Sequence, residues 1–196
     1  MKLPIKSRNL FLCAALVAFF CAVTGSAVAQ LDSGGSGVTC SGDLPESLTV
    51  TPSISTLSFT LTPFATTTPS TTISITTNWV LASTRVSVEL DAYFASASQA
   101  LSYSTYYIPS SAIYGNVTTS ESGGPSANSP FTQSATLGTA GAGLKLFLEP
   151  ITAGTNSEFE DTTTLALTVD LSHSSLYRTL PAATYTGTLT IAAQAI

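Results

Sequence analysis

The feature that most constrains the fold is a two-residue alternation of apolar with small or polar side chains, which starts at Ser47 and returns along the chain. It is clearest in residues 57–61, 73–76 and 165–171. Successive side chains of a β-strand point to opposite faces, so this alternation predicts strands with one buried face. The runs end at Pro, Gly or Thr/Ser clusters, which indicates turns. The pattern predicts an all-β fold, an antiparallel sandwich of about eight or nine strands.

The N-terminal segment predicts export. Three basic residues precede the apolar run 10–23, and the run is followed by the small residues Ala27-Val28-Ala29. This order is typical of a signal peptide, and the run is shorter than the roughly 20 residues that a bilayer span needs. We therefore expect a signal peptide at 1–29, a secreted or cell-surface protein, and no stable membrane insertion after cleavage.

The rest of the chain predicts a flexible leader and one domain. Residues 30–46 include four glycines between Gln30 and Gly42, and residues 47–196 carry the alternating pattern. Charged residues make up 9% of the chain and apolar residues 44%, a composition that favours a folded chain over a disordered one. Past residue 29 the sole cysteine is Cys40, which is either free or paired with another molecule.

The charge balance excludes nucleic acid as a partner. Past residue 29 the chain has eleven acidic side chains and three basic ones (Arg85, Lys145 and Arg178), which gives a net charge of −8. Binding to a phosphate backbone relies on clusters of Lys and Arg, and the sequence contains no such cluster. An anionic membrane surface is disfavoured for the same reason.

The strand expected around residues 86–91 carries the most charge. Its alternation predicts that Glu89 and Asp91 face water, and the strand rise of about 3.3 Å per residue separates Arg85 from Glu89 too far for an ion pair. Lys145 alternates with Leu144, Leu146 and Leu148. We therefore expect Lys145 to face solvent, which argues against a Lys–Asn cross-link of the kind found in some surface fibres.

No catalytic or metal site is predicted with any strength. His173 lies between Asp170 and Ser174, but triad residues normally converge from separate segments, so a solvated turn is the preferred interpretation. The acidic run 156–161 offers oxygen ligands that calcium would use, although its spacing fits no calcium motif, and a solvated acidic loop is preferred. The sequence indicates no cofactor, no metal and no enzyme.

Tyrosine is concentrated in one segment. Four of the seven tyrosines fall within twelve residues, namely Tyr103, Tyr106, Tyr107 and Tyr114. Aromatic rings with a polar tip stack on sugars and are enriched at protein interfaces, and Tyr is also a favoured strand residue. The segment therefore predicts a ligand or interface surface, with a core role for some of these rings as the alternative.

The order of the strand motifs resembles spore coat protein U and fimbrial, pilin-like domains. The motifs are Leu57-Ser58-Phe59, Thr72-Ile73-Ser74-Ile75-Thr76, Val86 to Asp91, and the closing Leu180-Pro181-Ala182-Ala183-Thr184-Tyr185 with its following strand. The resemblance covers about half of the exported part. It implies an immunoglobulin-like sandwich that is exported for surface filaments, in which one subunit lends a strand to the next.

A lent strand needs alternating apolar residues to fill a groove. The leader has none between Gln30 and Gly42, so the donor strand implied by the resemblance would use Leu48, Val50 and Ile54.

Two functions from different classes follow. The first is a non-enzymatic cell-surface structural or adhesive subunit, which associates with its own kind or with other surface proteins. The second is a carbohydrate-binding or adhesin-like module, which recognises glycans through the tyrosine-rich surface. An enzyme would require carboxylates from separate strands to converge, and the sequence offers Glu89, Asp91, Glu149 and Asp170 for that purpose.

Overall fold

The computed structural model describes residues 39–125, 127–134, 137–152, 158–172, 178 and 180–196, with Glu158 and Phe159 described by their backbone only. The chain divides into two units, Met1–Gly42 and Asp43–Ile196. The first unit contains the expected signal peptide, which lies outside the described residues; its described part, 39–42, is exposed coil with a free Cys40. In the described part of the chain, no helix is long and apolar enough to cross a membrane.

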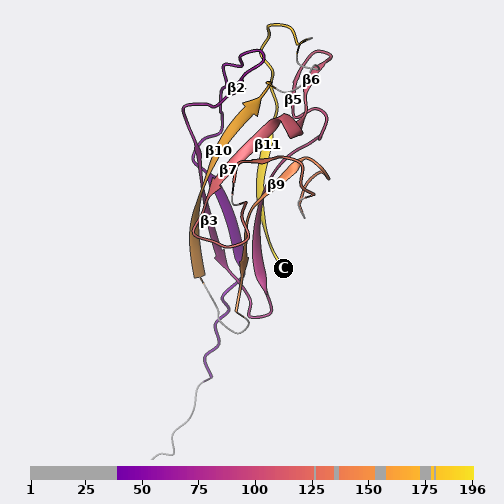
Figure 1. Ribbon diagram of the computed structural model, residues 1–196. Helices are drawn as coiled ribbons and strands as arrows, with labels where there is room; N and C mark the ends of the chain where they lie inside the picture. The colour runs from indigo at the N-terminus through magenta and orange to yellow at the C-terminus, as the bar shows by residue number, and fades with distance from the viewer. Residues whose placement is uncertain (1–38, 126, 135–136, 153–157, 173–177, 179) are drawn as a thin grey trace, which may run out of the picture. The chain divides into compact units, whose positions relative to one another are not determined.

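The second unit is an antiparallel β-sandwich, as predicted (Figure 1). The larger sheet has the order β1 (Ser47–Pro52), β3 (Ile73–Val80), β10 (Glu158–Asp170), β7 (Ile113–Thr118) and β8 (Ser129–Pro130), and β2 (Thr66–Thr67) pairs with the end of β10. The smaller sheet has the order β11 (Leu189–Ala195), β4 (Ser87–Phe94) and β9 (Gly143–Pro150). A separate hairpin consists of β5 (Leu101–Tyr103) and β6 (Tyr106–Ile108). A 3₁₀ turn, η1 (Ser110–Ala112), precedes β7.

The core lies between the two sheets and follows the alternation of the sequence. In β3 every second residue is buried, from Ile73 to Trp79, and the residues between them are half-exposed. Trp79 of the larger sheet packs against Phe147 of the smaller one, with ring centroids 6.3 Å apart. The sheets approach closely at Gly115 of β7, where an added Cβ would lie 2.5 Å from a Leu144 methyl. The fold thus depends on apolar burial between sheets.

The expectation that Glu89 and Asp91 face water is wrong. Glu89 is 2% exposed and Asp91 is fully buried, although both lie on the face of β4 that points away from the core. Leu137 and Gly138 lie on this outer face: the backbone N–H of Leu137 donates to Asp91 Oδ2 at 3.3 Å, and the backbone of Gly138 lies against the Tyr93 ring. A segment distant in sequence therefore lies against Asp91, which the alternation had predicted to face water.

Lys145 also departs from its expected environment. It stands opposite Asp91 in the β4–β9 ladder, and its Nζ lies 3.1 Å from Oε2 of Glu89. The side chain of Lys145 is 31% exposed, so it is partly covered and ion-paired. Arg85, as expected, is not the partner of Glu89; it pairs with Glu46.

A β-bulge changes the face of one strand in mid-run. The register of β9 shifts between the pairs Leu90–Phe147 and Asp91–Lys145, which leaves Leu146 as an extra residue. Leu146 and Phe147 are consequently both fully buried, whereas Leu148 is half-buried. The predicted alternation of three leucines with outward residues therefore holds only as far as Leu146.

Two predicted strands lie elsewhere than expected. Residues 57–61 alternate in burial and pack against the core, but they pair with no neighbouring strand. The strand that follows the closing motif begins at Leu189, and the chain around Tyr185 makes only an isolated bridge, Ser102 to Thr186.

Candidate functional site

The hairpin β5–β6 presents tyrosines to solvent. Tyr103, Tyr106 and Tyr107 are 46%, 39% and 37% exposed, and we call these three residues with their hairpin the tyrosine hairpin. Tyr103 and Tyr106 stand opposite each other in the ladder, while Tyr107 pairs with Ser102 on the other face. The base of the hairpin is fixed by the fully buried Ile108. The structure thus holds three exposed rings on a short, anchored support.

The turn of the hairpin is tight. Two residues, Ser104 and Thr105, join the strands, and Ser104 has a φ of 52°. Positive φ at the first residue of a two-residue loop matches the right-handed twist of a hairpin and is usually supplied by Gly or Asn. The serine accepts this conformation at some energetic cost, and the turn holds Tyr103 directly across from Tyr106.

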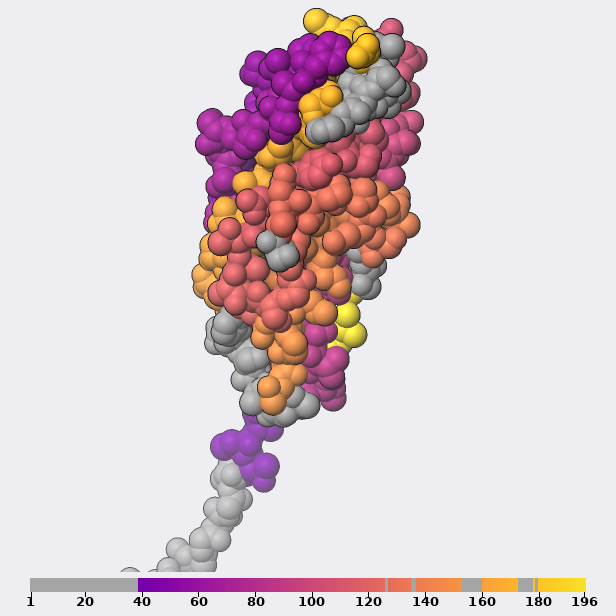
Figure 2. All heavy atoms as spheres, viewed as in Figure 1, coloured from indigo at the N-terminus to yellow at the C-terminus, as the bar shows by residue number. Residues whose placement is uncertain are grey.

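A fourth ring joins this surface from a distant part of the chain. Tyr185 packs edge-on against Tyr103, with centroids 6.0 Å apart, and donates its hydroxyl to the carbonyl of Pro181 at 3.1 Å. Burial raises the pKa of Tyr185, and Tyr106 and Tyr103 add to the rise. Tyr185 was not predicted to lie at this surface, because the Ser102–Thr186 bridge that brings it there has no local sequence signal. In Figure 2 the chain before β11 and the chain around β2 form the surface at this end of the domain.

Tyr114 does not join the tyrosine hairpin. It lies in β7 of the larger sheet, where it is half-buried and stands opposite Thr168 and Pro130. Proximity in sequence grouped it with the other three tyrosines. The 3₁₀ turn between β6 and β7 carries the chain to another sheet.

The residues predicted as a donor strand lie in and after β1 of their own chain. β1 is an edge strand that pairs with β3, and Leu48, Val50 and Ile54 are half-buried against the core. An edge strand leaves one side of its ladder open, so further strands can add there.

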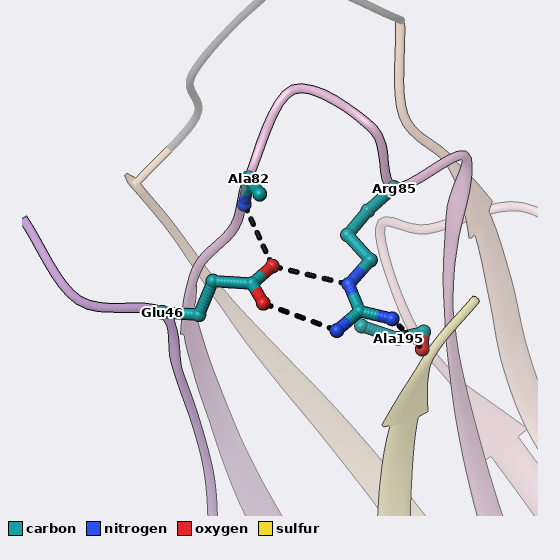
Figure 3. Close-up of polar contacts among 4 residues, drawn as sticks. All are labelled: Glu46, Ala82, Arg85 and Ala195. Atoms are coloured by element: carbon teal, nitrogen blue, oxygen red, sulfur yellow. Dashed lines mark hydrogen bonds and ion pairs between the residues drawn. The ribbon is translucent and has the colours of Figure 1, made fainter.

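A polar clamp holds the start of β1 in place (Figure 3). Glu46 accepts from the backbone N–H of Ala82 at 2.8 Å, and its two oxygens accept from Arg85 Nε and Nη2 at 3.1 and 3.0 Å. Arg85 Nη1 also donates to the carbonyl of Ala195 in β11 at 3.4 Å. The hydrogen bonds from Arg85, with that from Ala82, lower the pKa of Glu46 to about 2. The clamp connects the edge strands of both sheets.

The acidic run 156–161 is only partly described. Strand β10 begins at Glu158, and Asp161 is 1% exposed on the inner face, where it accepts from Thr163, Ser120 and Thr119 hydroxyls at 2.6, 2.9 and 3.3 Å. The expectation of a solvated loop is therefore wrong for Asp161. Glu160, its neighbour, is exposed.

The described residues form neither a catalytic triad around His173 nor a metal site. His173 lies outside the described residues, and Asp170 accepts from the backbone N–H and hydroxyl of Ser172. Within the described ranges, no group of three or more His, Cys, Asp or Glu side chains is arranged to hold a metal ion.

Comparison of the chain with protein-family models, curated proteins and solved structures finds no match.

Proposed function

We propose that this chain is an exported, non-enzymatic β-sandwich that serves as a structural or adhesive subunit at the cell surface. The observation that carries the proposal is the tyrosine hairpin, whose three rings are exposed on an anchored support. Tyrosine combines a large apolar ring with a hydroxyl and loses little conformational entropy on contact, so it is enriched where proteins bind other molecules. The expected signal peptide supplies the location.

The edge strand β1 supports self-association as one form of this function. Its free ladder side and its apolar residues Leu48 and Val50 are the features that strand exchange would use. In an exchanged assembly, β1 of one subunit would pair with β3 of the next. The Glu46–Arg85 clamp favours the pairing within one chain.

Light scattering with size-exclusion chromatography tests strand exchange. Residues 30–196 are compared with a chain that starts at Ser53 and lacks β1. If strands are exchanged, the longer chain forms concentration-dependent polymers, and the shorter chain is monomeric and binds an added peptide of residues 47–54. Monomers at every concentration of the longer chain would contradict strand exchange and leave adhesion through the tyrosine hairpin.

Carbohydrate binding is the second candidate function, and the exposed faces of Tyr103 and Tyr106 favour it. These rings are held opposite each other, and aromatic faces stack on the apolar faces of sugars. The same surface would then recognise a glycan and not a protein.

A pair of variants tests both candidates. Tyr106→Ala with Tyr107→Ala should abolish binding to cells and to a glycan array, whereas Tyr114→Ala, on another sheet, should leave both unchanged. Loss of cell binding with no glycan bound by the unaltered protein would support protein adhesion. Unchanged cell binding in the double variant would contradict a function of this surface.

A further inference from the structure

Three ionisable side chains meet on the outer face of the smaller sheet, where the Leu137 N–H donates to one of them, Asp91. Asp91 of β4 and Lys145 of β9 are direct partners in the ladder, so their side chains leave the same face with Cβ atoms about 5 Å apart. Glu89 lies two residues before Asp91 on that face, and its Oε2 is 3.1 Å from Nζ of Lys145. The amine of Lys145 and the carboxyls of Asp91 and Glu89 thus lie next to one another.

Burial changes the chemistry of this group. Asp91 is fully buried, and the side chain of Glu89 is 3% exposed. Burial raises the pKa of Asp91 to about 7, and the neighbouring Glu89 adds to the rise, while the Leu137 N–H and Lys145 oppose it. Near neutral pH a large fraction of Asp91 is therefore a neutral carboxylic acid, which an amine can attack, whereas a carboxylate resists attack.

We propose that Lys145 and Asp91 form an intramolecular amide bond between Nζ and Cγ, with Glu89 as the proton carrier. The four-carbon stem of Lys145 allows its Nζ to move from Glu89 to Asp91, because the two carboxyls are neighbours on one face of β4. Holding two reactants side by side on one face raises the effective concentration of the amine at the carboxyl.

The step balances without any added reactant. The Lys145 ammonium first gives a proton to the Glu89 carboxylate, and the nitrogen lone pair then attacks Cγ of the protonated Asp91. The C–N bond forms, and the C–O bond to the hydroxyl breaks with its electron pair. Glu89 gives its proton to the leaving hydroxyl and takes one from the nitrogen, so the products are an amide, one water and a neutral Glu89. The reaction also removes a buried ion pair.

The bond would join β4 to β9 and close the stretch of chain from Asp91 to Lys145. Closing a long stretch restricts the unfolded chain, as a disulfide does. Cys40 is the sole cysteine past residue 29, so the chain offers no disulfide for this purpose. The proposal stands apart from the function of the tyrosine hairpin, since the bond would form in the isolated domain.

Intact-mass spectrometry of the purified, folded protein tests the bond. The unaltered protein should weigh one water less than its sequence, and a protease digest should contain the peptide of Asp91 joined to that of Lys145. Lys145→Arg keeps the charge but should show its full sequence mass and a Tm lower by several degrees. A full sequence mass for the unaltered protein, or a digest without the joined peptides, would overturn the proposal.

Two further variants test the role of Glu89. Glu89→Gln cannot accept the proton and should lose the bond, whereas Glu160→Gln, an exposed carboxylate of β10, should keep it. Circular dichroism establishes that each variant is folded before its mass is compared. An unchanged yield of the bond in Glu89→Gln would remove Glu89 from the mechanism and leave proximity alone.

Discussion

The central strands of the two sheets, β10 and β4, differ in how they use their two faces. In β10 the inner residues from Asp161 to Val169 are buried, and the outer face, largely threonine, is exposed to varying degrees. In β4 the five residues from Val88 to Ala92 are all buried, including the outward-facing Glu89 and Asp91, and the Leu137 N–H donates to Asp91 on that face. The difference teaches that charge on alternate positions marks the outer face of a strand but does not establish that water reaches it.

Breaking the alternation of β10 should have the largest effect. Leu165→Asp places a charge without a partner on the fully buried inner face, and we expect a loss of more than about 4 kcal/mol in unfolding free energy, enough to prevent folding. Thr162→Asp, on the exposed face of the same strand, should cost less than about 1 kcal/mol. Soluble yield and urea denaturation measure both. Equal effects of the two variants would contradict a one-sided β10.

Removal of Lys145 tests the covered face of β4. Lys145→Ala leaves the buried Glu89 without this cation and also removes the proposed amide bond, so we expect a loss of at least about 2 kcal/mol in unfolding free energy. A Lys145 that faces solvent, as the sequence alone predicted, would make this substitution silent. Adding Glu89→Gln in the same chain should recover part of the loss in urea denaturation. A silent Lys145→Ala would mean that the outer face of β4 is hydrated like that of β10.

The next prediction concerns how the stability of the domain depends on pH near the start of β10. Burial, with the adjacent Glu149, raises the pKa of Glu121 from its usual 4.5 to about 7. The folded state therefore binds this proton more tightly than the unfolded state. The resulting stability is fully present below about pH 4.5 and is lost as the pH rises through about 7.

Urea denaturation between about pH 5 and pH 8 measures this contribution. The midpoint should fall as the pH rises, and Glu121→Gln should flatten the slope, whereas Glu160→Gln should leave it unchanged. A slope that Glu121→Gln does not alter would exclude the pair Glu121 and Glu149 as its source.

The exposed clamp should have the smallest effect. Glu46 and Arg85 keep 39% and 41% of their side-chain surface exposed, so Arg85→Ala should lower the unfolding free energy only slightly in low salt and less still in high salt. In the Arg85→Ala variant, the backbone amides of β1 should exchange hydrogen faster before those of other strands do. If Arg85→Ala instead increases self-association, β1 is released for exchange between chains.

The sequence predicted the features that depend on local period. The alternation in residues 73–76 and 165–171 identified the inner faces of those parts of β3 and β10, because each strand keeps one phase there. It failed in β9, where the bulge at Leu146 reverses the phase, and in residues 57–61, where alternation occurs without a partner strand. Both failures depend on pairing with segments far away in the chain.

Only the part of the candidate site that is local in sequence was predicted. Tyr103, Tyr106 and Tyr107 share one short hairpin, so their grouping is local. Tyr185 reaches them through the Ser102–Thr186 bridge, and the group of Glu89, Asp91 and Lys145 depends on a ladder between β4 and β9. Neither arrangement has a signal in any single stretch of sequence.

The pairing of β3 with β10 has a kinetic consequence. Ile73 meets Leu165, and Thr66 of β2 meets Asp170, so the larger sheet closes only after most of the domain has been synthesised. Sheets built from such distant pairs fold in milliseconds to seconds, slowly beside helical bundles. During that time the apolar faces of the early strands lack their cover and are open to aggregation. The early strands must therefore be kept unfolded or shielded until β10 is available to pair with them.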